Sequence, residues 1–318
     1  MEGGPVLLVD GLNLFIRNFC ANPLVVEGQH VGGIVGSVQS LGFLVRCHSP
    51  SEVVIVWEGG GSSRRRAINP NYKNGRRPVG LNRNEQDGIT DTVENRNWQL
   101  KFLVNALQDT PVRQIYITDV EADDVIGYMA RYMFEDRNII ICSSDHDYYQ
   151  LLSERVSIYS PTLKEMVTLE TFRQKYEVTP WNFMVARCFI GDASDALSGI
   201  EGIGLKTLLN RVDAMKEERK LSVEDVISEC ESKVSTSKVK AYKSIVDNAH
   251  TARTNFRLMT LDTSNLSGSQ VNKIQRTFDL EVPSPNKMSM IRKFVKVGIK
   301  TFDIDRFFLA MNSIQRVK

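Results

Sequence analysis

The segment NIIICSSDHDYYQLL, residues 138–152, decides the fold and directs attention to a site. Its first part, residues 138–143, is a run of β-branched apolar residues, which is typical of a fully buried strand. The strand ends in two acids, Asp145 and Asp147, which only His146 separates. Because like charges this close repel each other, a protein that places both acids there needs something to compensate them. We interpret the histidine as a spacer that points away from the acids.

Strands alternate with helices on both sides of this segment. Over the first half of the chain, the alternation predicts right-handed crossovers and a mostly parallel, twisted sheet with helices on both faces. Helical patterns dominate the second half, which predicts an α/β domain over residues 1–190 and a smaller helical domain over residues 191–318. The expected strands are residues 5–10, 52–58, 113–118, 138–143 and 155–160, and the expected helices include residues 35–46, 95–108 and 122–134.

The composition narrows the class of protein. A chain of 318 residues with 42% hydrophobic and 25% charged residues is that of a soluble globular protein, for which one large and one small domain are expected. The formal net charge of +2 leaves the class of partner open. The 5 cysteines are scattered without a CxxC pair, which argues against a zinc site or a disulfide framework and fits a reducing cytoplasm. We expect neither a signal peptide nor a transmembrane helix.

Acidic residues follow four of the expected strands. In an open parallel sheet, functional groups gather outside the carboxyl ends of the strands, so acids from separate parts of the sequence are expected to meet at one edge. The segment GDASD, residues 191–195, adds two more acids farther along the chain. The expected cluster comprises Asp10, Glu58, Glu121, Asp123, Asp124, Asp145, Asp147, Asp192 and Asp195.

A helix cap is the simplest alternative for any one of these acids, and we interpret Asp119 as such a turn residue. A cap needs one acceptor per helix, however, so capping does not account for two or three acids in one place. Magnesium and manganese ions prefer hard oxygen ligands, and a carboxylate-rich cleft suits them. Two such ions, about 3.5–4 Å apart, form the usual clamp for attack of water on a phosphodiester.

A basic insert follows the second expected strand. Residues 59–83 contain no acid, and their seven basic residues are Arg64, Arg65, Arg66, Lys73, Arg76, Arg77 and Arg83. A charge run is usually a solvated face, but an acid-free run beside an acidic cleft suggests a grip for a polyanion. Tyr72 adds a surface on which a base could stack.

Closely spaced glycines mark a second candidate contact. Gly199, Gly202 and Gly204 precede Lys206 and Thr207, which open an expected helix. Such glycines let backbone N–H groups approach a phosphate, although an ordinary turn between helices has the same pattern. Lysines at positions 233, 238, 240 and 243 either extend this contact along duplex backbone or form a solvated helix face.

Several motifs together resemble one family, the structure-specific 5′ nucleases, which include flap endonucleases and the 5′-nuclease domain of bacterial DNA polymerase I. The motifs occur in the family's order and span about residues 5–212; they are LLVDGLNLFIR, VIVWEGGGSSRRR, NYKNGRR, VEADDVIG, SSDHDYYQLL and GDASDALSGIEGIGLKT. Two later segments, IYSPTLKEMVT and MIRKFVKVGIKTF, are similar to the ribonuclease H of the T-even bacteriophages, which suggests a phage source.

The resemblance implies a PIN-like fold and a role for each residue. One Mg²⁺ or Mn²⁺ would be held by Asp10, Glu58, Glu121, Asp123 and Asp145, and a second by Asp147, Asp192 and Asp195, with Asp124 in support. Lys73 and Arg76 would lie in a basic arch at about residues 59–94 and act on the scissile phosphate. Beside these catalytic residues, the implied nucleic-acid contacts are Arg64, Arg65, Arg66, Tyr72, Arg77, Gly202, Gly204, Lys206 and Thr207.

The glycine-spaced turn resembles the family's helix–three-turn–helix motif, which grips duplex DNA and often holds K⁺ through main-chain carbonyls. One residue departs from the family pattern, because Glu58 stands where an Asp is usual. We expect a shifted, water-mediated metal contact there, and the preferred metal is in doubt.

The implied function is a metal-dependent 5′→3′ exonuclease and flap endonuclease on RNA–DNA and DNA–DNA duplexes, which removes RNA primers and flaps in replication. It would be a cytoplasmic monomer, with a single-strand-binding protein and a sliding clamp as partners. A catalytically weakened nucleic-acid-binding scaffold stays open because of Glu58. A phosphatase is disfavoured because Leu12 breaks the D-x-D pattern, and a topoisomerase-primase type of domain because Asp10 replaces its glutamate. We expect the C-terminal segment, residues 287–318, to pack on the small domain.

Overall fold

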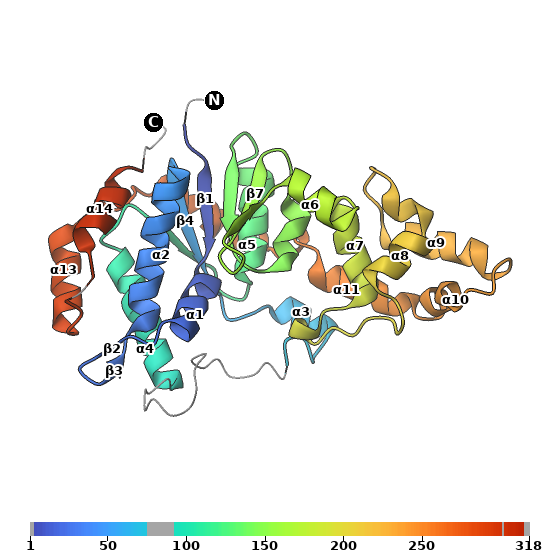
Figure 1. The fold of residues 1–318 in the computed structure, drawn as a ribbon, viewed down its shortest axis with the longest axis horizontal. Coiled ribbons are helices and arrows are strands. Elements are labelled where there is room, and N and C mark those ends of the chain that lie inside the picture. The colour runs from blue at the N-terminus through green and yellow to red at the C-terminus, as the bar shows by residue number, and fades with distance from the viewer. Residues whose placement is uncertain (1–2, 75–91, 301, 315–318) are drawn as a thin grey trace.

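The computed structural model describes residues 3–74, 92–300 and 302–314, and a six-stranded sheet lies at its centre (Figure 1). The strand order is β5-β4-β1-β6-β7-β8, in which the first five strands pair in parallel and β8 pairs antiparallel with β7. The predicted mostly parallel sheet is therefore confirmed. The strands are β1 (Val6–Asp10), β4 (Glu52–Trp57), β5 (Arg113–Tyr116), β6 (Ile139–Cys142), β7 (Val156–Ser160) and β8 (Glu165–Val167).

Helices cover both faces of the sheet, as predicted. The central strand β1 is buried from both sides, since Val6, Leu7, Leu8 and Val9 are all 0% exposed, and alternate residues point to opposite faces. One face is covered by α1 (Gly11–Ala21), α2 (Gly32–His48) and α4 (Val93–Leu107). A two-stranded hairpin joins α1 to α2; its strands are β2 (Val25–Val26) and β3 (Gln29–His30). The other face is covered by α5 (Ala122–Tyr128), the π-helical turn η2 (Met129–Met133) and α7 (Pro180–Ile190), with α6 (Leu169–Tyr176) packed beside α7.

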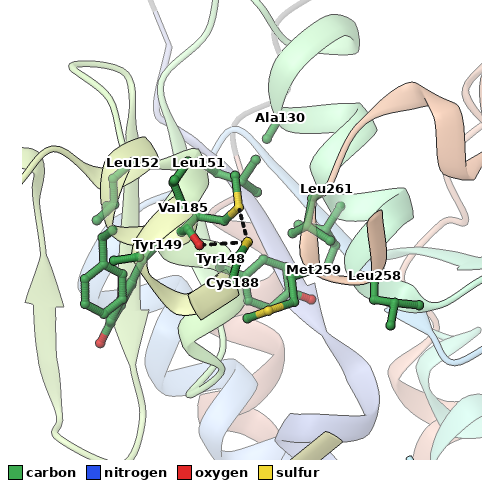
Figure 2. Close-up of a cluster of buried hydrophobic side chains, with 14 of the residues drawn as sticks. Ala130, Tyr148, Tyr149, Leu151, Leu152, Val185, Cys188, Leu258, Met259 and Leu261 are labelled. Carbon is green, nitrogen blue, oxygen red and sulfur yellow. Dashed lines mark hydrogen bonds between the residues drawn. The ribbon is translucent and has the colours of Figure 1, made fainter. Parts of the chain in front are cut away.

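Helices α7 and α11 (Ala249–Met259) join the helical half of the chain to the sheet. Figure 2 shows their buried side chains, among them Val185, Cys188 and Leu258, packed with Tyr148 from the segment after β6. The Cys188 thiol lies 3.3 Å from the Met184 carbonyl oxygen, to which it donates. The predicted domain boundary near residue 190 stays a prediction, because this core continues across it. The helices beyond it are α8 (Leu205–Arg211), α9 (Val223–Val234), α10 (Lys240–Asp247), α11 (Ala249–Met259) and α12 (Gly268–Asp279).

The two C-terminal helices, α13 (Lys287–Lys296) and α14 (Ile304–Asn312), pack on the α/β half of the molecule, so the expectation that they pack on the helical half is wrong. Figure 1 shows them, in red, beside α2 and at the opposite end of the molecule from α8, α9 and α10. The ring of Phe307 fits against Gly42, where an added Cβ would lie only 3.1 Å away. Apolar spacing reveals that a helix has a buried face, but it does not reveal which partner covers that face.

No helix within the described ranges is both long enough and apolar enough to cross a membrane.

Candidate active site

Four of the predicted acids meet in one pocket at the carboxyl edge of the sheet. The pocket has a volume of about 510 Å³, and Asp10, Glu58, Asp123, Asp145 and Lys73 contribute to its lining. The acids come from four places in the sequence: the end of β1, the residue after β4, the first turn of α5 and the loop after β6. The parallel order of the strands brings these places together, because each chain segment leaves the sheet at the same edge. We call this cavity the acid pocket.

A second group of acids lies behind the acid pocket. Carboxylate oxygens of Glu121, Asp123 and Asp124 lie within 4.8 Å of one another, a spacing that could hold a metal ion. Glu121 and Asp124 are only 2% and 1% exposed, so their charges are largely removed from water. Burying carboxylates is costly unless they are paired, so this group requires a cation close by.

The guanidinium group of Arg65 is that cation, which differs from the role that the sequence predicted for this residue. We expected Arg65 to face nucleic acid, but it is 2% exposed. Its guanidinium donates to Asp124 through two nitrogens, at 2.6 and 2.8 Å, to Glu121 at 2.7 Å and to the Leu258 carbonyl oxygen at 2.8 Å. The short helix α3 (Ser63–Ile68) explains the difference, because successive residues on a helix point about 100° apart. Arg65 therefore points inward while its neighbours point outward.

The two neighbours of Arg65 are exposed, as expected for a nucleic-acid contact. Arg64 donates to Asn265 at 3.2 Å and to Ser264 at 3.3 Å, and Arg66 lies 3.9 Å from Asp119. Arg76 and Arg77 lie outside the described residues.

Tyr72 also departs from expectation. Its ring is not a free stacking surface, since the residue is 7% exposed. Its hydroxyl lies 3.0 Å from a Glu121 oxygen and 3.2 Å from an Asp195 oxygen, so it is part of the acid cluster. The next residue, Lys73, places its Nζ 2.8 Å from Glu121 and 3.9 Å from Asp195, while its side chain lines the acid pocket.

A third group of acids contains Asp147 and Asp192, and Arg187 bridges them. The guanidinium of Arg187 donates to both carboxylates, one through each terminal nitrogen. Sequence reasoning missed this arginine. A signal was present, because Arg187 is the only charged residue in the sequence of α7, PWNFMVARCFI, and it lies just before the GDASD acids.

Burial and repulsion from neighbouring acids raise the pKa of several acids of the site, among them Asp10 and Asp147. Desolvation raises the pKa of Asp10 to about 6, and the charges of Asp123 and Glu58 add to this effect. Burial and then Asp145 likewise raise the pKa of Asp147, although Arg187 opposes them. Raised acid pKa values mean that a cation brought into the site is strongly favoured. The donors are all carboxylate oxygens, which fits Mg²⁺ or Mn²⁺ and does not fit a soft metal.

Glu58 has a contact that an aspartate would not reach in the same way. Its Oε1 accepts a hydrogen bond from the Gly61 backbone N–H at 3.1 Å, while its Oε2 lies 3.4 Å from the Ala122 backbone nitrogen at the start of α5. Gly61 has a φ of 84°, a left-handed conformation that favours glycine. The longer side chain therefore bridges the glycine loop and α5 while it still lines the acid pocket.

The glycine-spaced turn leaves backbone accessible. An added Cβ at Gly202 or Gly204 would meet nothing within 4 Å, so the space beside each Cα atom is open. Gly204 is the N-cap of α8, and Lys206 and Thr207 lie in the first turn of that helix. His146 does not line the acid pocket; its ring stacks on Tyr149, with centroids 4.8 Å apart.

Two further arginines line the acid pocket, and sequence reasoning missed both. Arg17 comes from α1 and Arg96 from α4. Arg17 follows Asp10 by seven residues, which is two helical turns, so the spacing itself could have placed it on the side of the site. Arg96 carries no such signal, because nothing in the local sequence relates α4 to the strand ends.

Comparison with known proteins agrees with this geometry. The family model described as 5′-3′ exonuclease, N-terminal resolvase-like domain, matches residues 5–177, more than half of the chain. The flap endonuclease Xni of Shewanella sp. (strain MR-4) is 30% identical over 203 residues, which cover 63% of this chain and 72% of that protein. The DNA polymerase I of Thermus filiformis is 32% identical over 206 residues, which cover 64% of this chain but only 23% of the polymerase.

Solved structures share the fold. The T5 D15 protein, co-crystallized with metal ions, superposes with a TM-score of 0.68 at 21% identity, over 86% of this chain and 98% of that one. The catalytic core of Rad2 in complex with a DNA substrate has a TM-score of 0.57 at 12% identity, over 97% of this chain and 93% of that one. With the family model spanning the sheet and the acids at its edge, the chain belongs to the 5′-3′ exonuclease and flap endonuclease family.

Proposed function

We propose that this protein is a divalent-metal-dependent 5′ nuclease. It acts as a 5′→3′ exonuclease and flap endonuclease on DNA–DNA and RNA–DNA duplexes, and in replication it removes RNA primers and 5′ flaps. The observation that carries the proposal is the acid pocket, in which carboxylates from four separate segments and Lys73 share one cavity. Such a cavity suits a phosphodiester, because ions held by the acids would attract the phosphate that the acids alone repel.

The acids divide into two ion positions in this proposal. Asp10, Glu58, Asp123 and Asp145 hold the first ion in the acid pocket, with Glu121 behind it. Asp147, Asp192 and Asp195 would hold the second, with Asp124 in support, and the guanidinium of Arg187 lies between Asp147 and Asp192. When bound, two such ions lower the pKa of a coordinated water and neutralise charge on the phosphate.

Lys73 contributes a fixed positive charge and does not act as a base. Burial works to lower the pKa of Lys73, but the charges of Asp123 and Glu121 outweigh it and raise this pKa above its usual range. The amine therefore stays protonated at neutral pH and can donate hydrogen bonds to a phosphate in the acid pocket. Arg65 holds Glu121 and Asp124 in place behind it, so we assign Arg65 a positioning role.

Contacts to nucleic acid surround this centre. Arg64 and Arg66 face solvent on α3, while the open backbone of Gly202 and Gly204 beside Lys206 and Thr207 supports a grip on duplex phosphates. Carbonyls of the same turn would hold K⁺. Arg76 and Arg77 belong to the proposal through the sequence alone. These contacts touch phosphates, so specificity is for the shape of a 5′ end at a junction. A single-strand-binding protein and a sliding clamp are proposed partners of the monomer.

The hydrogen bond between Glu58 and Gly61 favours one alternative, a scaffold that binds nucleic acid without cutting it, because part of one metal ligand is engaged already. A cleavage assay on a 5′-labelled flap separates the two functions. We expect cutting in Mg²⁺, none in EDTA, and a loss of at least about 100-fold in Asp147→Asn. Asp136→Asn, an exposed acid outside the site, serves as the matched control. Tight binding without cutting by the wild type would favour the scaffold.

A further inference from the structure

A second cavity adjoins the acid pocket. It has a volume of about 340 Å³ and lies between α4 and the ends of β4 and β5. Leu12, Glu58 and Leu100 line both cavities, so the two share a wall. We call it the side pocket, and its lining is almost entirely apolar: Leu12, Trp57, Leu100, Val104 and Tyr116, with Glu58 and Lys101 at its edges.

The fold builds the side pocket from paired strands. Trp57 and Tyr116 are partners in the parallel ladder of β4 and β5, so their rings lie on the same face of the sheet. The indole N–H of Trp57 donates to Gln114 at 2.9 Å, and the Gln114 amide donates to the Val104 carbonyl oxygen at 3.1 Å. These bonds tie both strands to α4, so the floor of the side pocket is held in place without any ligand.

Tyr116 is the unusual residue of this pocket. It is 60% exposed at the end of an edge strand, although the paired Trp57 is only 7% exposed. Lys101 is also exposed, and no ion-pair partner for it lies among the residues that the structure describes. An exposed aromatic ring and an exposed ammonium group, beside a centre for phosphate chemistry, match the two parts of a nucleotide: a flat base and its phosphate.

We propose that the side pocket binds one unpaired base of the substrate strand, next to the bond that is cut. This inference rests on the proposed nuclease function and adds a subsite to it. The cavity is at the small end of ligand pockets, and its volume is sufficient for a single base. The base stacks against Tyr116 and the edge of Trp57, while Lys101 contacts the adjoining phosphate. Because the lining offers few polar groups, the pocket accepts any base.

The test combines a protein variant with an altered substrate. A series of flap substrates is prepared, each of which lacks one base at a different position near the cut bond, on either side of it. Each substrate is cleaved by excess enzyme in Mg²⁺. The enzyme concentration that gives half of the maximal cleavage rate is measured. For the wild type, we expect that concentration to rise at least about fivefold at one position, the value of one lost stacking contact. Tyr116→Ala should show the same rise with the intact substrate and no further rise with the missing base at that position.

Two variants serve as controls. Tyr116→Phe keeps the ring and should behave as the wild type, whereas Tyr132→Ala removes a tyrosine that is 48% exposed outside the side pocket and should change nothing. If the penalties of the missing base and of Tyr116→Ala simply multiply at every position, no base lies on Tyr116 and the subsite is refuted. If the wild type cuts no flap at all, it is the proposed function that fails instead.

Discussion

Replacing Arg65 by methionine should destabilise the protein in a way that depends on pH. Arg65 is the buried partner of Glu121 and Asp124, and methionine keeps much of its volume but removes the charge. Removing one partner from a buried ion pair typically costs about 3–5 kcal/mol of unfolding free energy, because the other charge stays buried and uncompensated. For a chain of 318 residues, the unfolding entropy is roughly 0.7 kcal/mol/K, so the melting temperature should fall by about 4–8 °C near neutral pH.

The sign of the pH dependence follows from the direction of the shift. Burial, followed by repulsion from Asp123, already raises the pKa of Asp124 to about 7 while Arg65 opposes this rise. Without the arginine, the pKa of folded Asp124 rises further, whereas the unfolded value stays near 3.8. The folded state then holds an extra proton between these values, so its stability is greatest below about pH 4 and falls as pH rises through the folded pKa. Wild-type Asp124 shares this dependence up to its own pKa of about 7, so the additional loss in Arg65→Met should be small at pH 5 and largest at pH 8.

Thermal unfolding in EDTA at pH 5, 6, 7 and 8 measures this effect, with Arg66→Met as the matched control. Arg66 is next along the chain and exposed, so its replacement should shift the melting temperature by less than about 1 °C. Adding Mg²⁺ should recover part of the loss in Arg65→Met, because a divalent ion can replace the missing charge. An Arg65→Met protein that melts with the wild type, or whose loss is the same at every pH, would refute the reasoning.

Three further predictions concern the acid pocket. Lys73→Met should lower the maximal single-turnover rate of flap cleavage by roughly 100-fold, the usual cost of a lost charge donor, and Lys73→Arg should recover part of it. Because the pKa of Asp10 is raised to about 6, protons compete with the metal in acid, so the half-saturating Mg²⁺ concentration should rise several-fold from pH 7 to pH 5. In EDTA, Arg187→Met should have a lower melting temperature than the wild type, and added Mg²⁺ should remove the difference. Differential scanning calorimetry measures both temperatures. Equal melting temperatures in EDTA would contradict this prediction.

The central sheet was predictable because its strands are buried on both sides. Such strands are continuous apolar runs, and β1, β4 and β6 are of this kind. The edge strand β8 escaped prediction, since it has only three residues and gains its structure from pairing with β7. The position of a strand in a parallel sheet also determines where the following loop emerges, which is why the sequence alone predicts that the acids meet.

Helix α4 shows where periodicity fails. Its large apolar residue Trp98 is only half-buried in the structure. The buried side instead contains Gln99, which is 0% exposed and whose Oε1 accepts from the Ile34 backbone N–H at 3.2 Å. The Gln99 amide also donates to Asn95 at 2.7 Å. A hydrophobicity pattern predicts that a polar residue such as Gln99 lies at the surface. It does so because the pattern takes no account of hydrogen bonds between helices, which allow a polar side chain to be buried.

The basic insert shows a different limit. A count of charges over residues 59–83 assigns every arginine to one surface, yet α3 separates adjacent arginines by direction. Arg65 points inward and compensates the charges of buried acids, whereas Arg64 and Arg66 point outward and remain available for nucleic acid. Arg187 was missed because one of its partners, Asp147, lies 40 residues away in the sequence. Charge counts along a chain identify partners poorly when the opposite charges belong to distant segments.

The internal cations also determine which acids are left for metal. Asp124 and Glu121 are paired with Arg65, and Asp147 is paired with Arg187. Asp10 and Asp145, by contrast, have no ion-pair partner within the part of the chain that the structure describes, and both line the open acid pocket.

This division implies an order of ion binding. The unpaired acids of the acid pocket can accept an ion without any rearrangement, whereas an ion between Asp147 and Asp192 must first displace Arg187, which now bridges them. The first ion should therefore bind more tightly than the second in the free protein. Arg187→Met removes the competitor, so calorimetric titration with Mn²⁺ should show the weaker of two binding steps strengthened and the stronger one unchanged. If both steps shift together, the two positions are not separate, and the division of the acids proposed here is wrong.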